Sequence, residues 1–158
     1  MSKNTQNSIL HIHLEGELQR YNLEGRWNDY IAVQKEVLKV LREDNFFEDN
    51  IVAHKESGLF IKVTPRGIRE TFGNGKRFNT TSKLTKQRKV ATIIHIKELI
   101  TTSKLILDNF PNFHPDGNST FAYFENELLI DDVTFSVRIT VQKKISTNLF
   151  YIHHIDEI

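Results

Sequence analysis

Residues 119–158 read STFAYFENELLIDDVTFSVRITVQKKISTNLFYIHHIDEI and carry the strongest strand signal in the chain. They contain three runs rich in aromatic and β-branched residues, separated by polar stretches around Asp131–Asp132 and residues 143–148. Runs of this kind with turn-forming residues between them are typical of consecutive antiparallel strands. We therefore predict that the chain ends in a three-stranded meander.

The middle run of the meander has one apolar and one polar face. Successive side chains of a strand point to opposite sides of a sheet. The apolar face carries Val133, Phe135, Val137, Ile139 and Val141, and the polar face carries Thr134, Ser136, Arg138 and Thr140. The pattern predicts that the apolar face packs in the core and that Arg138 lies on the open face, either as a solvated side chain or as a phosphate ligand.

Helices are predicted mainly before the meander. Apolar residues at helical spacing indicate an amphipathic helix over residues 27–43 and a long helix over residues 86–107. Between them, residues 59–64 favour a strand, and Pro65 is suited to open a short helix. The other expected elements are a strand over residues 8–14, a loop after it, a basic loop over residues 73–85 and a long turn over residues 109–119.

This order of elements predicts an α+β fold in which N-terminal helices pack on a C-terminal antiparallel β-sheet. The chain of 158 residues suits one domain with an extension. We place the extension, a strand and a helix, in residues 1–51 and the α+β domain in residues 52–158.

The composition excludes several classes of site and favours a polyanionic partner. The absence of cysteine rules out disulfides, thiolate zinc sites and cysteine nucleophiles. Residues 52–104 hold 12 Lys and Arg against three Asp and Glu, whereas the rest of the chain holds nine and 17. Such a local excess of positive charge is expected where a protein binds nucleic acid, although basic helices are as often simply solvated.

The final run, residues 150–157, contains two adjacent histidines. Strict alternation places Phe150, Ile152 and His154 on the core side and Tyr151 with His153 on the open face near Arg138, and a bulge would reverse the two histidines. Histidine can give or take a proton near pH 7, so an open face with His, Tyr and Arg is suited to metal-independent RNA cleavage. A single histidine is nevertheless more often an ordinary surface or hydrogen-bonded residue.

His11 and His13 share a strand face at a spacing compatible with metal binding, but no third ligand accompanies them. We therefore expect no metal or cofactor site. No apolar run approaches the roughly 18 residues of a membrane span, and the N-terminus has no signal-peptide pattern. These features predict a cytoplasmic protein without a membrane partner, or a toxin module delivered into the cytoplasm of a target cell.

Three short motifs occur in a characteristic order. Lys55, Ser57 and Gly58 form a polar turn before a short strand, Thr64, Gly67 and Ile68 begin a helix, and Tyr151, His153 and His154 lie in the last strand. In this order the motifs resemble nucleases of the barnase–EndoU–colicin–RelE-like group, which occur in phage, in large polyvalent proteins and in bacterial toxin modules. The resemblance covers about two thirds of the chain and excludes the first fifty residues.

The resemblance implies a small α+β fold with a four- or five-stranded sheet and metal-independent cleavage of RNA through a 2′,3′-cyclic phosphate. It implies that Lys55 contacts phosphate, that Thr64 positions it and that His153 or His154 transfers a proton. With the residues of the open face, the candidate catalytic set is Lys55, Thr64, Arg138, Tyr151, His153 and His154.

Basic residues of the central segment are the candidates for backbone binding, with Phe78, Tyr123 and Tyr151 as candidates for base stacking. The basic set is Lys62, Arg66, Arg69, Lys76, Arg77, Lys83, Lys86, Arg88 and Lys89. RNA is the expected partner, with a cognate inhibitor or immunity protein as a second one. Two alternatives stay open: a nucleic-acid-binding domain without catalysis, and an immunity or adaptor module that meets an acidic protein.

Overall fold

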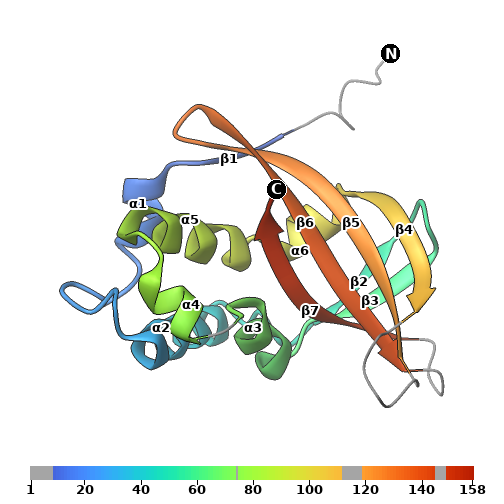
Figure 1. Ribbon diagram of the computed structural model, residues 1–158, viewed down its shortest axis with the longest axis horizontal. Coiled ribbons are helices and arrows are strands. Elements are labelled where there is room, and N and C mark those ends of the chain that lie inside the picture. Colours follow the sequence, from blue (N-terminus) through green and yellow to red (C-terminus); the bar gives the residue numbers. More distant parts are fainter. Residues whose placement is uncertain (1–8, 74, 112–118, 145–148) are drawn as a thin grey trace.

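The computed structural model describes residues 9–73, 75–111, 119–144 and 149–158. Helices gather on one side of a curled β-sheet, whose long strands β5, β6 and β7 lie side by side (Figure 1). The fold is therefore α+β, as predicted. In the described residues the strands are β1 (Leu10–Ile12), β2 (Ile51–His54), β3 (Leu59–Lys62), β4 (Lys104–Pro111), β5 (Ser119–Ile130), β6 (Val133–Lys144) and β7 (Phe150–Glu157).

The sheet is mixed rather than antiparallel, and it is larger than expected. Its strand order is β1-β5-β6-β7-β3-β2, with β4 also paired to β5. The meander β5-β6-β7 is antiparallel as predicted, but β1 runs parallel to β5 and β3 runs parallel to β7. The prediction of an antiparallel sheet of four or five strands is therefore wrong, because the pairing of the short early strands depends on contacts distant in sequence.

The helices do not all precede the sheet along the chain, in contrast to the predicted order. They are α1 (Leu14–Leu18), α2 (Tyr30–Glu43), α3 (Pro65–Thr71), α4 (Gly75–Thr80), α5 (Lys83–Ile94) and α6 (Ile96–Thr101). The β2–β3 hairpin separates α2 from α3. Helix α2 confirms the predicted amphipathic helix and begins after Asp29, whose carboxylate accepts a hydrogen bond from the Ala32 amide.

Three predicted segments differ from the observed ones. The loop expected after the first strand contains helix α1. The expected basic loop over residues 73–85 contains α4, because the buried ring of Phe78 packs edge-to-face against Tyr30 and Phe72 and holds these residues in place. The expected long helix breaks at His95 and ends at Thr101, and the residues from Lys104 onward form β4. Short apolar runs fit either a helix or a strand, and here the pairing with β5 decides between them.

One hydrophobic core joins the helices to the sheet. It includes Ile12 and Val37 from the first fifty residues together with Ile93, Phe124 and Ile139 from the later ones. The predicted boundary between the extension and the α+β domain, between residues 51 and 52, falls within strand β2. The sheet face opposite the core, which we term the outer face, carries Lys62, Tyr123, Arg138, Thr140 and Tyr151. Among the described helices, none is long and apolar enough to traverse a bilayer.

Candidate functional site

Strand β7 contains a bulge that sets the direction of its two histidines. Val141 pairs with Ile152 and Thr140 pairs with His154, so His153 is an extra residue on β7. Ile152 and Ile155 on either side are buried in the core. His153 and His154 therefore both face away from the core, and their ring centroids lie 6.4 Å apart.

The sequence-based assignment of the two histidines to opposite faces is thus wrong, because the bulge interrupts the alternation on which it depends. The ring of His153 lies 5.5 Å from that of Phe121, a buried residue that does not belong to the main core cluster. The surroundings of His154 differ: its Cε1 atom lies against Gly73, in the connection between α3 and α4.

His154 and Asp156 form a pair at the end of β7. The Nε2 atom of His154 lies 3.0 Å from Oδ1 of Asp156. Burial alone would raise the pKa of Asp156, but the hydrogen bond and charge of His154, together with the charges of Lys89 and Arg77, lower it below its ordinary value. Asp156 is therefore an anion that can fix the orientation of the His154 ring.

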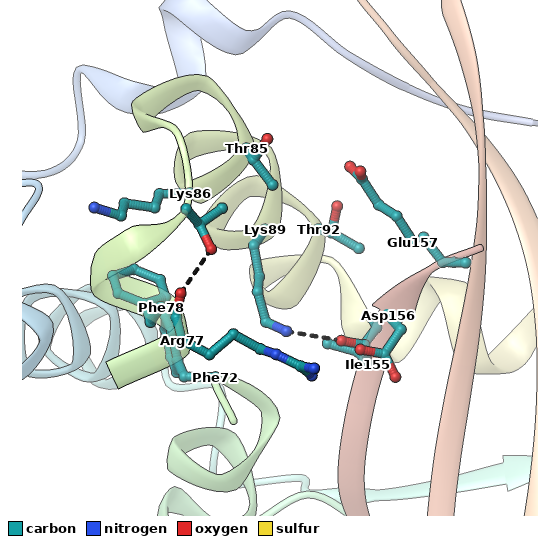
Figure 2. A pocket seen from close by; sticks show the side chains of 12 residues that line it. Phe72, Arg77, Phe78, Thr85, Lys86, Lys89, Thr92, Ile155, Asp156 and Glu157 are labelled. Carbon is teal, nitrogen blue, oxygen red and sulfur yellow. Dashed lines mark hydrogen bonds between the residues drawn. The ribbon is translucent and has the colours of Figure 1, made fainter. Parts of the chain in front are cut away.

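A pocket of about 280 Å³ adjoins this pair, between α4, α5 and the end of β7. Figure 2 shows Arg77 and Lys89 pointing from the helices toward Asp156. Aromatic rings, hydroxyl groups and charged groups of both signs meet in the pocket. Its lining residues are Phe72, Arg77, Phe78, Thr81, Thr85, Lys86, Lys89, Thr92, Val137, Ile155, Asp156 and Glu157.

Lys89 is one of the charged residues that line this partly apolar pocket. Its Nζ atom donates a hydrogen bond of 2.9 Å to the carbonyl oxygen of Ile155. Burial lowers the pKa of Lys89, an effect that the charges of Asp156 and Glu157 oppose and that of Arg77 reinforces. A lysine ammonium is suited to hold a phosphate. Because a lowered pKa makes its proton easier to remove, such a lysine can also take part in proton transfer.

The structure brings only some of the predicted basic residues to the pocket. Arg77, Lys86 and Lys89 line it, and Arg88 lies beside it, where its Nε atom is 2.9 Å from Oε2 of Glu157. Lys86 is only 1% exposed and donates a 2.6 Å hydrogen bond to Oδ1 of Asn28, so its ammonium joins α5 to the segment before α2. The remaining predicted basic residues lie outside the pocket lining: Lys62, Arg66, Arg69, Lys76 and Lys83.

Three predicted catalytic residues have other surroundings. The hydroxyl of Thr64 accepts a 2.9 Å hydrogen bond from the Gly67 amide and caps α3. Lys55 is exposed in the turn before β3, and because β3 runs parallel to β7, this turn lies beyond the beginning of β7 and away from His154. Arg138 lies across from Asp156 on β6, but its guanidinium is 2.7 Å from Glu125 and stacks over Tyr123.

Asp156 is the residue of this site that the sequence-based reasoning missed. The signal was available, since His154 and Asp156 are two residues apart on a strand and therefore share a side of the sheet. A histidine with a carboxylate at that spacing is a candidate pair for proton transfer. Within the described residues, no group of three or more His, Asp or Glu is placed to hold a metal ion.

Comparison with known protein families gives a match over most of the chain. The model of the family described as large polyvalent protein-associated domain 3 matches residues 28–151. The match begins just before α2, includes all the helices that line the pocket, and ends at Tyr151, two residues before the histidine pair. No curated protein and no solved structure matches the chain.

Proposed function

The chain belongs to the large polyvalent protein-associated domain 3 family, and we propose that this member is a metal-independent endoribonuclease whose site is the outer side of β7 and the adjoining pocket. The proposal names an activity that the family description does not. It rests on one observation above all: His154 is paired with Asp156, and Asp156 lies within a pocket that also holds Arg77 and Lys89.

The site contains the groups that cleavage through a 2′,3′-cyclic phosphate requires. The 2′-oxygen attacks phosphorus, so that the O2′–P bond forms and the P–O5′ bond breaks. His154, oriented by Asp156, accepts the proton of the 2′-hydroxyl, and His153 donates a proton to the departing 5′-oxygen. The two histidines end with their protons exchanged, and a second proton transfer through water restores them.

The negative charge that develops on the phosphate needs fixed cations. Arg77 and Lys89 supply them, since both reach toward Asp156 at the border between the pocket and β7 (Figure 2). Arg88 and Lys86 are engaged with Glu157 and Asn28 and hold the pocket together. The substrate is cytoplasmic RNA, either in the producing cell or in a cell that receives the protein, and a cognate inhibitor protein would protect the producer.

The test is cleavage of mixed cellular RNA in EDTA by the wild type and by His154→Ala, His153→Ala and Asp156→Asn. We expect each histidine variant to lose roughly 10²- to 10⁴-fold of the rate, and the 5′ fragments of the wild-type reaction to end in a cyclic phosphate. His11→Ala, which alters an exposed histidine of β1, is the matched control and should cleave at the wild-type rate.

Intact RNA at high wild-type concentration, or equal rates in the wild type and the β7 variants, would overturn the proposal. RNA binding that weakens with added salt, without cleavage, would favour the binding-domain alternative. The basic residues around the pocket would suffice for that function. The absence of any salt-sensitive RNA binding would favour the protein-interaction module.

A further inference from the structure

The outer face of the sheet carries a row of side chains beside the histidines. Cross-strand partners lie opposite each other on the same face of a sheet. Lys62 pairs with Ile51 on one side and Tyr151 on the other, and Tyr151 in turn pairs with Gln142. These four residues therefore form one continuous row across β2, β3, β7 and β6, which we term the Tyr151 row.

Phe60 adds a second exposed aromatic ring next to this row. It lies two residues before Lys62 on β3 and therefore faces the same side. Phe60 is 50% exposed, Tyr151 is 38% exposed and Ile51 is 47% exposed. Because Tyr151 is the β7 partner of Lys62, Phe60 and Tyr151 are diagonal neighbours in the sheet, with backbone positions about 7–8 Å apart.

The charge of this surface suits a nucleic-acid strand. The Tyr151 row contains a lysine and no acidic residue, and among the described residues no ion pair joins Lys62 to an acid. Lys55, with Glu56 next to it, lies in the exposed turn that leads into β3. Aromatic rings with a cation between them bind unpaired bases by stacking and the backbone by charge.

The row continues directly to the histidines. Gln142, the partner of Tyr151, is two residues from Thr140, the partner of His154. Residues two apart on a strand are separated by about 7 Å. A base stacked on Tyr151 therefore has its sugar and phosphate within reach of the histidine pair, without crossing to another face of the sheet.

We infer that Phe60, Lys62 and Tyr151 form a platform on which bases of single-stranded RNA stack next to the cleavage site. This inference rests on the proposed function and specifies its substrate as unpaired RNA. A duplex hides the faces of its bases in the stack, so it cannot use the platform. Tyr151 then acts in base binding rather than in proton transfer.

The test measures fluorescence anisotropy of a labelled 12-nucleotide RNA with the non-cleaving His154→Ala protein as the background. We expect the single strand to bind more tightly than the same sequence in a duplex. Adding Phe60→Leu or Tyr151→Leu should weaken single-strand binding roughly 5- to 150-fold each, whereas Tyr151→Phe, which keeps the ring, should retain it. Val133→Ala alters an exposed apolar side chain at the β5–β6 turn and is the control.

Unchanged binding in the two leucine variants, or equal binding of duplex and single strand, would overturn the platform even if the wild type cleaves RNA. Conversely, ring-dependent binding of the single strand by a wild type that cleaves no RNA would keep the platform and reject the ribonuclease proposal. If the surface around Phe60 and Tyr151 binds a protein partner instead, RNA binding will not depend on the two rings. The two proposals therefore fail separately.

Discussion

The two ends of strand β7 are built differently and pack against different helices. At its beginning, β7 pairs with β3 through Phe150 and Tyr151, and Ile152 packs directly on Gly67 of α3. Beyond Ile152 no residue of β3 is paired with β7. There Lys89 donates a hydrogen bond to the carbonyl oxygen of Ile155, as a neighbouring strand would do with its amide.

This difference shows why the candidate site lies where it does. Backbone pairing with β3 and the contact of Ile152 with Gly67 close the helix-facing side of the first end of β7, whose outer face carries the exposed ring of Tyr151. At the second end, the ammonium of Lys89 rather than a strand binds the carbonyl oxygen of Ile155, and a pocket lies beside it. The end of β7 without a strand partner is thus the end beside which the pocket forms.

The largest effect on stability is expected at the first end of β7, where Ile152 packs on Gly67. We call this end the closed end and the end beside the pocket the open end. In Gly67→Ala the new Cβ would collide with Cγ2 of Ile152 and lie 3.1 Å from the Ile152 carbonyl oxygen and 3.2 Å from Oγ1 of Thr64. Because backbone limits the movement of these atoms, the free energy of unfolding should fall by about 1–3 kcal/mol. Urea unfolding followed by circular dichroism measures it.

The matched control is Gly16→Ala in α1, where nothing lies within 4 Å of the added Cβ. Alanine is the better helix former, so this variant should be as stable as the wild type or gain up to about 1 kcal/mol. Equal stabilities of Gly67→Ala and the wild type would show that the first end of β7 is not closely packed.

A smaller effect is expected at Thr64, also at the closed end. Thr64→Ala removes the hydroxyl that caps α3 and should cost about 1 kcal/mol of unfolding free energy, whereas Thr64→Ser keeps the hydroxyl and should cost less. The same two variants separate the capping role from the phosphate-binding role suggested by the resemblance. RNA cleavage that falls in Thr64→Ala far beyond its loss of folded protein would support the phosphate role.

The smallest stability effect is expected at the open end and depends on pH. The folded-state pKa of Asp156 lies below the unfolded value of about 3.9, so ionised Asp156 stabilises the fold above that pH. The contribution is lost as the pH falls from about 3.9 through the lower folded value. Since the pair is half exposed, solvent screens it to below about 1 kcal/mol.

Unfolding of the wild type and of Asp156→Asn, measured between pH 6 and pH 2, checks this expectation. The difference in unfolding free energy between the two proteins should shrink as the pH falls below about 3.9, because Asp156 is protonated first in the unfolded state and then, at lower pH, in the folded state. A difference that stays constant over the whole range would contradict an ionised Asp156 held by His154, Lys89 and Arg77.

Local sequence patterns were sufficient for the elements whose signal lies within one segment. The amphipathic spacing of α2, the alternation in β6 from Val137 to Val141 and the Thr64–Pro65 start of α3 all appear in the structure. Val133, predicted on the core face of β6, is instead exposed, because it lies at the β5–β6 turn beyond the packed part of the strand. Helix α4 and the change from α6 to β4 could not be predicted in this way, because the contacts of Phe78 with two distant rings and the pairing of β4 with β5 decide them.

The same distinction between local signals and distant contacts applies to the candidate site. The sequence by itself determined that basic residues are concentrated in the middle of the chain and that two histidines lie in the last strand. Only the tertiary structure decided which of these groups meet. The bulge at His153 turns both rings to one side, the cap of α3 engages the hydroxyl of Thr64, and the missing strand partner opens the pocket that Arg77, Lys89 and Asp156 share. Residue types fix the chemistry that is available, whereas the register and the packing of distant segments fix which groups lie close enough to act together.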